Sequence, residues 1–171
     1  MEKLLWIDLE MSGLDVEKER IIEAAAIVTD KNLKELETYH SVVKQDQKFI
    51  DGMDEWNTQH HGDSGLIAAI PSGKDPGIVE KELIALVERH FSDEMPVLSG
   101  NSIAHDRLFI RTYFKDLASK LHYRILDVTS WKLMMKAQFG VEYEKKNTHR
   151  ALDDIRESIA ELRYYLGFVK V

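Results

Sequence analysis

The sequence predicts an α/β fold in which a mixed central β-sheet is flanked by α-helices. Two apolar runs, residues 3–10 and 21–29, stand near the beginning of the chain, and amphipathic segments interleaved with short apolar runs follow them. Strands that come first and are then followed by helices interleaved with short strands are typical of such a sheet. No repeat or linker divides the 171 residues, so we expect one domain over residues 1–171.

The first part of the predicted sheet is a strand followed by a hairpin. Residues 3–10 fit a strand that carries carboxylates at its end. Residues 21–29 fit either a helix or a buried strand by pattern alone, but a turn signal at residues 30–32 and a partly alternating segment up to Val43 favour a strand. These two segments then form a hairpin beside the first strand.

Helices dominate the rest of the chain. Gly62 interrupts a pair of short helices and Pro71 closes it, whereas Ile78, Leu83 and Leu86 share one face of a long amphipathic helix. A short strand is expected at residues 97–99. The predicted helices cover residues 50–61 and 64–70, about 77–91, a segment from about 104, about 128–139, and 149–166.

Charge and composition narrow the classes of function. The net charge is −7, from 23 basic and 30 acidic residues, whereas proteins that grip long nucleic acids usually present a basic surface. This argues against long duplexes and long single strands, but is compatible with a short nucleotide held in a pocket. The absence of cysteine excludes disulfides and thiolate metal ligands. No segment fits a signal peptide or a membrane span, so we expect a cytoplasmic protein that does not engage membranes.

Asp8 and Glu10 are the sharpest local feature. In a strand, residues two apart point to the same face, so both carboxylates project together. Neighbouring carboxylates repel each other unless a cation compensates them, and hard divalent cations prefer oxygen ligands of this kind. A D-x-E pair alone, however, is more often an acidic strand end than a metal site.

Two further acidic positions are candidates of the same kind. Asp106 follows a Gly-Asn-Ser turn at the predicted start of a helix, where the helix dipole alone also favours an acid. On the last predicted helix, simple spacing pairs His149 with Asp153, but Asp154 flanks the apolar stripe whereas Asp153 points further toward solvent. Asp154 is therefore the better metal-ligand candidate, and Asp153 is the expected surface acid.

The order of these motifs resembles the DEDDh family of 3′→5′ exonucleases. That family's pattern is a D-x-E at the end of the first strand, a central Asp and a late H-x-x-x-x-D. The residues that fit it are Asp8, Glu10, Asp106, His149 and Asp154. The similarity covers nearly the whole chain and points to the branch that degrades very short RNA. It is carried further by residues 11–15, 53–57, 100–103, 122–124, 126–128 and 151–158.

The resemblance implies a ribonuclease H-like fold and the chemistry of a two-metal exoribonuclease. The carboxylates that would hold two Mg²⁺ or Mn²⁺ ions are Asp8, Glu10, Asp106 and Asp154. Such a pair of ions acts on the attacking and leaving oxygens of a phosphodiester. His149 would be the general base for the attacking water, since the unperturbed pKa of imidazole, about 6.5, lies near working pH. The expected products are nucleoside 5′-monophosphates, released from the 3′ end of very short RNA such as dinucleotides.

The resemblance also implies contacts with the substrate. Leu14 would be an apolar wedge between the two terminal bases, and Trp56 would be a stacking platform that tolerates every base. His61 matches a histidine of the family's substrate site. Ser102 and Arg124 resemble groups that cap the 5′ phosphate of a dinucleotide, and a cap of this kind would limit substrate length.

Tyr123 resembles an aromatic residue that a second subunit supplies to the active site, which implies a homodimer acting on short single-stranded RNA.

Two segments depart from the family pattern. Ala104-His105 stands before Asp106 where Gly-Gln is more usual, and residues 129–131 replace a Ser-Thr-Leu type of run. The first departure affects the surroundings of Asp106 but leaves its carboxylate, and the second bears on the phosphate cap. Neither changes the expected reaction class. The alternatives are another DEDDh exonuclease, acting on DNA ends or transfer RNA, and a dimeric nucleotide-binding module without catalysis.

Overall fold

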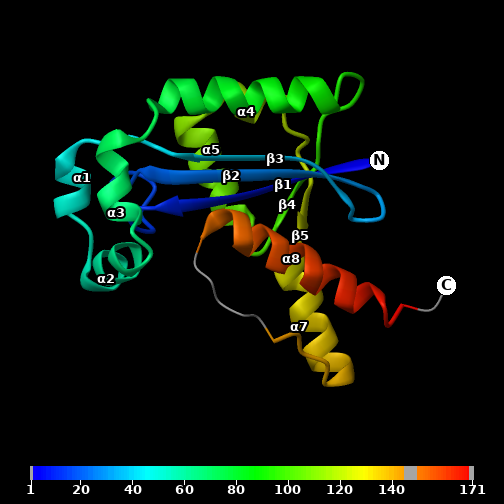
Figure 1. Ribbon diagram of the computed structural model, residues 1–171. Helices are drawn as coiled ribbons and strands as arrows, with labels where there is room; N and C mark the ends of the chain where they lie inside the picture. The colour runs from blue at the N-terminus through cyan, green and yellow to red at the C-terminus, as the bar shows by residue number, and fades with distance from the viewer. Residues whose placement is uncertain (1, 145–149, 170–171) are drawn as a thin grey trace.

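The computed structural model describes residues 2–144 and 150–169, and its strands form one mixed sheet in the order β3-β2-β1-β4-β5 (Figure 1). The strands are β1 (Lys3–Met11), β2 (Ile21–Asp30), β3 (Glu35–Val42), β4 (Leu98–Gly100) and β5 (Ile125–Asp127). The first three pair antiparallel, whereas β4 pairs parallel with β1 and β5 pairs parallel with β4. The predicted mixed α/β sheet is confirmed.

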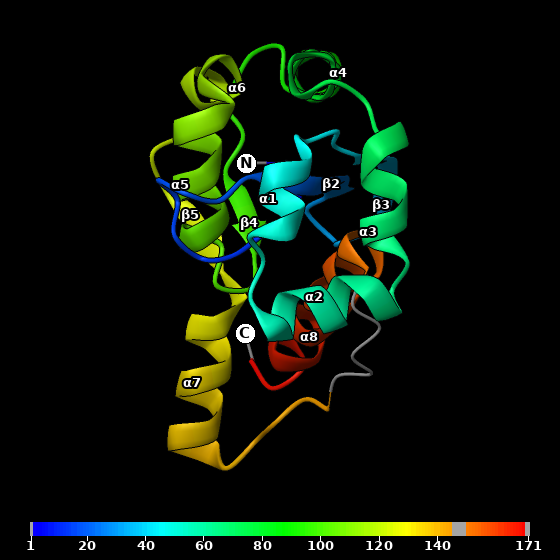
Figure 2. The same cartoon turned by 90° about the vertical axis from the view of Figure 1, so that its left-hand side faces the viewer.

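Helices cover the two faces and one end of this sheet. They are α1 (Gln47–Asp51), α2 (Glu55–Asp63), α3 (Leu66–Ala69), the 3₁₀ helix η1 (Ile70–Ser72), α4 (Pro76–His90), α5 (Ala104–Tyr113), α6 (Lys115–Lys120), α7 (Val128–Phe139) and α8 (Ala151–Leu166). In Figure 1, α4 and α5 lie above the sheet, and α7 and α8 lie below it. Figure 2 shows α1, α2 and α3 gathered at the end of the sheet that faces the viewer.

Alternation of side chains along β1 produces two core layers. Leu4 and Trp6 are buried against α8 together with Ile155 and other apolar residues of that helix, whereas the odd-numbered residues of β1 face the layer formed by α4 and α5. Asp8 and Glu10 continue the even-numbered face, since side chains two apart lie on the same side of a strand. Both acids therefore project toward the side of the sheet that α8 covers.

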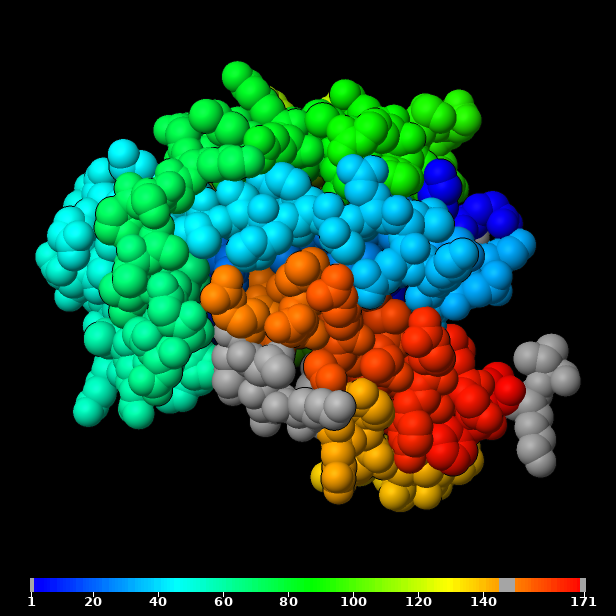
Figure 3. Space-filling model, in the orientation of Figure 1, coloured from blue at the N-terminus to red at the C-terminus, as the bar shows by residue number. Residues whose placement is uncertain are grey.

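β2 is buried along almost its whole length, which explains why its sequence shows no alternation. The segment lies between β1 and β3 and is covered on both faces, so a strand, not a helix, is correct for residues 21–29. Three consecutive alanines, fully buried, keep its surface flat. Ala25 is the cross-strand neighbour of Asp8. The small Ala25 side chain allows α8 to approach the end of β1. Figure 3 shows α8 packed directly below β3.

Several boundaries differ from the prediction. The helix predicted over residues 50–61 is interrupted, because Gly52 ends α1 and the side chain of Asp54 caps α2 by accepting from the backbone N–H of Asn57 at 2.7 Å. β5 and α6 were not predicted. The last helix begins at Ala151 among the described residues, and residue 149, where its start was predicted, lies outside them. Within the described ranges, every helix is too short or too polar to cross a membrane.

Candidate active site

Three of the four predicted carboxylates meet between β1 and α8. Asp8, Glu10 and Asp154 each offer a carboxylate oxygen, and these oxygens lie within 4.8 Å of one another. Asp154 stands in the first turn of α8. Its neighbour Asp153 instead lies 3.6 Å from the guanidinium of Arg156, with half of its side chain exposed. The helical face chosen from the sequence is therefore the one that α8 turns toward β1.

Asp106, the fourth carboxylate, is buried beside this cluster and lies outside the group of three. It stands in the first turn of α5, and its Oδ1 accepts a hydrogen bond of 2.9 Å from the backbone N–H of Leu9. This N–H is available because β4 pairs with β1 only at Leu5 and Trp6. The Asp106 side chain is thus bonded to the backbone of the residue that stands between Asp8 and Glu10.

The electrostatics of the cluster favour a bound cation. Burial, together with the negative charges of Glu23, Asp154 and Asp106, raises the pKa of Glu10 to about 8 against an opposing effect of Arg150. Burial also raises the pKa of Asp106 to about 7. Negative charge is therefore poorly compensated here by the described protein groups, and a hard divalent cation with oxygen ligands would compensate it. The donor set fits Mg²⁺ or Mn²⁺.

These pKa shifts predict how the stability of the metal-free protein depends on pH. A carboxyl group whose pKa is raised on folding favours the folded state below its ordinary pKa, near 4, and loses this contribution as pH rises through the folded value. For Glu10 and Asp106 the loss falls between about pH 4 and pH 8. In EDTA we expect the Tm to fall from pH 5 to pH 8, on the order of 5 °C, and Mg²⁺ to raise it more at pH 8.

Differential scanning fluorimetry on wild type and Glu10→Gln measures this effect. The variant removes the carboxyl group whose pKa is raised to about 8, so its Tm should depend less on pH in EDTA. A wild-type Tm that is flat or rising between pH 5 and pH 8 without metal would contradict the electrostatic description of the cluster.

The predicted base contacts lie on exposed surfaces near the end of β1. Leu14 is 77% exposed and Trp56 is 65% exposed, and the Trp56 ring stacks on His60 with 4.4 Å between centroids. His61 is buried, and its Nε2–H donates to the carbonyl of Met11 at 3.0 Å. Burial lowers the pKa of His61, which favours the neutral imidazole. This contact fixes α2 beside the residue that follows Glu10.

Ser102, one of the two residues predicted to cap the phosphate, is held by side chains at the end of β5 and the start of α7. Ser102 has a positive φ of 50°, and its backbone N–H donates to Oδ1 of Asp127 at 3.0 Å and to Oγ1 of Thr129 at 2.9 Å. Thr129 belongs to a segment that departs from the family pattern, yet it holds Ser102. Asp127 also caps α7. Neither was predicted as a site residue, although an acid directly before the predicted start of a helix at 128 was a visible capping signal.

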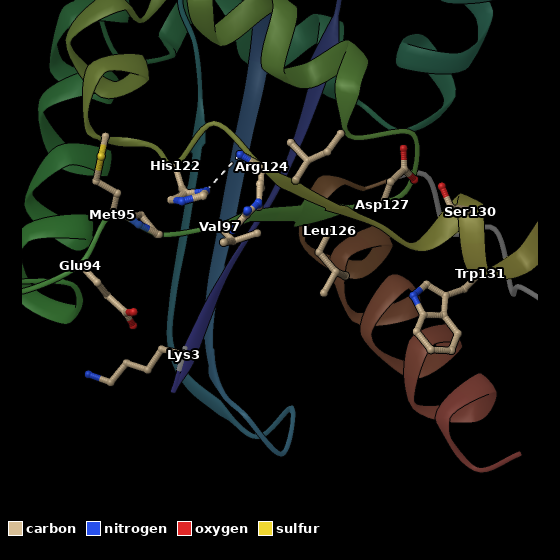
Figure 4. Close-up of a pocket in the computed structure, with 12 residues that line it drawn as sticks. Lys3, Glu94, Met95, Val97, His122, Arg124, Leu126, Asp127, Ser130 and Trp131 are labelled. Atoms are coloured by element: carbon tan, nitrogen blue, oxygen red, sulfur yellow. Dashed lines mark hydrogen bonds between the residues drawn. The ribbon is translucent and has the colours of Figure 1, made fainter. Parts of the chain in front are cut away.

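Tyr123 and Arg124 lie beside edge strand β5. Tyr123 is 71% exposed, and the Arg124 guanidinium lies 5.0 Å from the centre of its ring. Arg124 lines a cavity of about 910 Å³, shown in Figure 4 with His122, Asp127 and Trp131. None of the three clustered carboxylates lines this cavity, so it is separate from the candidate metal site. His149 lies outside the described residues.

Comparison with known proteins agrees with this geometry. The family model described as exonuclease, RNase_T, matches residues 5–162. The oligoribonuclease of Alcanivorax borkumensis is 46% identical over 167 residues, which cover 95% of this chain and 92% of that protein. The mitochondrial oligoribonuclease of Homo sapiens is 39% identical over 173 residues, covering 96% of this chain and 72% of the human protein.

Solved structures show the same fold at lower sequence identity. Exonuclease I from Methylocaldum szegediense has a TM-score of 0.73 at 20% identity, over 98% of this chain and 41% of that one. The zinc-bound complex of E. coli exonuclease I with single-stranded DNA has a TM-score of 0.75 at 16% identity, over 95% and 40%. The chain spans about two fifths of these exonuclease I chains, and the likeness confirms the ribonuclease H-like fold. With the identities above, it follows that the chain is a nuclease and belongs to the oligoribonuclease family of exonucleases.

Proposed function

We propose that residues 1–171 act as a single 3′→5′ exoribonuclease domain that degrades very short RNA, dinucleotides in particular, to nucleoside 5′-monophosphates. The observation that carries this proposal is the carboxylate cluster of Asp8, Glu10 and Asp154 between β1 and α8, in a chain whose relatives are named oligoribonuclease. The net charge of −7 supports a substrate with few phosphates, because binding of long nucleic acids relies on many cationic contacts.

The four predicted carboxylates would bind the metal ions of this reaction. Asp8, Glu10, Asp106 and Asp154 would hold two divalent cations, Mg²⁺ or Mn²⁺. When bound, such ions stabilise the charge that develops on the attacking and leaving oxygens of an in-line displacement. The carboxylates would hold both ions from two rigid elements, β1 and α8, with Asp106 added from α5. His149 would take the proton of the attacking water as general base.

The exposed aromatic and apolar groups would bind the substrate. Leu14 would separate the two terminal bases and Trp56 would stack on a base, with His61 holding α2 against the end of β1. Ser102 and Arg124 would contact the 5′ phosphate. Stacking makes no distinction among the four bases, which suits an enzyme that clears RNA fragments of any sequence.

A homodimer completes this arrangement. Tyr123 is largely exposed on its own subunit, and we propose that it reaches the active site of the partner. The edge of β5 and the exposed apolar residues of α7 offer a surface for such an assembly. These α7 residues are Leu133, Met134 and Phe139.

Time courses on 5′-labelled RNAs of two to seven nucleotides test the proposed function. The reactions would contain Mg²⁺, with an EDTA control and a matched DNA dinucleotide. We expect the RNA dinucleotide to be converted fastest and longer chains more slowly. Faster cleavage of longer RNA or of DNA would place the chain in another branch of the exonucleases, and no turnover with Mg²⁺ or Mn²⁺ would contradict an enzyme of this class.

Substitution of Arg124 by alanine tests the phosphate cap. A hydrogen bond to a charged group contributes about 1.5–3 kcal/mol, so we expect kcat/KM for the RNA dinucleotide to fall about 10- to 100-fold while a pentanucleotide loses less. Arg111→Ala is the matched control, because Arg111 is exposed on α5. An equal loss for both RNA lengths would show that Arg124 does not measure the 5′ end.

A further inference from the structure

Glu23 of β2 is a fully buried carboxylate next to the candidate metal site. Its relative exposure is 0%. Glu23 is the cross-strand neighbour of Glu10 and shares the face of β2 that carries Ala25 and Ile27, both packed under α8. A buried charge is retained in a fold only when other groups compensate it, so its partners indicate what it does.

Groups of His40, Arg150 and Ala151 contact this carboxylate. Oε1 lies 2.6 Å from Nε2 of His40 on β3 and 3.4 Å from the guanidinium of Arg150. Oε2 accepts a hydrogen bond of 3.3 Å from the backbone N–H of Ala151, the first residue of α8. Glu23 therefore joins the middle of the sheet to the start of the helix that carries Asp154.

The hydrogen bond from the Ala151 N–H gives α8 an acceptor that its own N-cap residue does not provide. The first N–H groups of a helix have no partner within the helix, and a Ser, Thr, Asp or Asn at the N-cap usually accepts from one of them. The N-cap of α8 is Arg150, whose side chain makes no such bond. Glu23 supplies such an acceptor from strand β2. Its negative charge also interacts favourably with the positive end of the helix dipole.

The anchored turn is the one that presents Asp154. The backbone N–H groups of Asp153 and Asp154 both donate to the carbonyl of Arg150 at 2.9 Å. The hydrogen bond that the adjacent Ala151 N–H donates to Glu23 thus fixes the same turn, on which the Asp154 carboxylate is held near Asp8 and Glu10. Catalytic groups must be held within fractions of an ångström of their working positions.

We propose that Glu23 is a positioning residue: acting as an N-cap supplied from β2, it sets the first turn of α8 and so places the Asp154 carboxylate against Asp8 and Glu10. This inference rests on the proposed function only for its kinetic readout. It gives a role to a glutamate beside Glu10, where its charge is otherwise unfavourable for the cluster.

Glu37 provides a matched control within the same sheet. It lies on β3 and also pairs with one arginine and one histidine, Arg89 at 2.5 Å and His90 at 2.6 Å. These partners stand at the end of α4, and the Glu37 side chain is 35% exposed. Glu37→Gln therefore removes the same kinds of contact without touching α8.

The experiment compares Glu23→Gln, Glu23→Ala and Glu37→Gln with wild type. Amide hydrogen exchange in metal-free protein is followed by NMR for residues 151–154. In Glu23→Gln, which keeps the shape and one acceptor oxygen, we expect these amides to exchange about tenfold faster while those of residues 159–166 are unchanged, since a charged acceptor is about twice as strong as a neutral one. Glu23→Ala should exchange faster still, and Glu37→Gln should match wild type.

Calorimetric titration with Mn²⁺ and steady-state kinetics on an RNA dinucleotide complete the test. We expect Glu23→Gln to bind Mn²⁺ several-fold more weakly and to lose about tenfold in kcat with KM within about twofold, because substitution of a residue that supports a metal ligand weakens metal binding and activity.

Unchanged exchange at residues 151–154, or equal acceleration along all of α8, would overturn the positioning role. If wild type cleaves no RNA, the proposed function fails, and the exchange and Mn²⁺ data still decide this inference. Glu23→Gln keeps the test valid if Glu23→Ala does not fold.

Discussion

Asp154→Ala is expected to reduce kcat for an RNA dinucleotide by about 10³-fold or more, whereas Asp153→Ala should stay within about threefold of wild type. Removing Asp154 takes one of three carboxylates from the cluster between β1 and α8. Metal ions contribute several kcal/mol to the transition state, and each 1.36 kcal/mol is a factor of ten in rate. Asp153 loses only a half-exposed contact with Arg156, which is worth little.

The pair of variants is informative because the two residues are adjacent in one helical turn. Circular dichroism and Tm measurements should show both variants folded, and calorimetry should show weakened Mn²⁺ binding for Asp154→Ala alone. Equal loss of activity in two folded variants would mean that the helical face assigned to catalysis is incorrect.

His149→Ala is expected to lower kcat by about 10²- to 10⁴-fold, the usual contribution of a general base, with little change in KM. The expectation comes from the family motif, in which His149 precedes Asp154 by five residues. His90→Ala serves as the control, because His90 pairs with Glu37 at the end of α4 and lies in no part of the proposed site.

The pH dependence of the residual activity separates a base from a structural histidine. Wild-type kcat should fall at acidic pH as the imidazole becomes protonated, and His149→Ala should lose that acidic limb. Added imidazole should restore part of the lost rate. A variant that retains more than about a tenth of wild-type kcat, with the same pH profile, would exclude His149 as the base.

Much of the site was predictable because it depends on local periodicity. Alternation in β1 placed Asp8 and Glu10 on one face, and helical phase separated Asp154 from Asp153; the structure brings Asp8, Glu10 and Asp154 together. Both inferences need only the geometry of a single element. The role of His149 stays a prediction, since it lies outside the described residues.

The parts that escaped prediction depend on distant contacts. β5 is three residues long and forms by parallel pairing with β4, so its own sequence carries little signal. Glu23 is separated by more than a hundred residues from Arg150 and Ala151, and a glutamate inside an apolar run says nothing of its partner. Asp106 was predicted as a ligand, but its bond to Leu9 follows from how early β4 leaves β1.

That early departure of β4 has a consequence for stability. Beyond Trp6, among the described residues, β1 has no further paired partner in β4, and the backbone N–H of Leu9 donates to Asp106 instead. Leu9 and Asp106 are both buried, so an N–H left without an acceptor there costs about 1–3 kcal/mol. Asparagine at position 106 would keep an acceptor for this N–H, whereas alanine would remove it. Asp106→Ala should therefore have a lower Tm than Asp106→Asn, even though both lose the carboxylate.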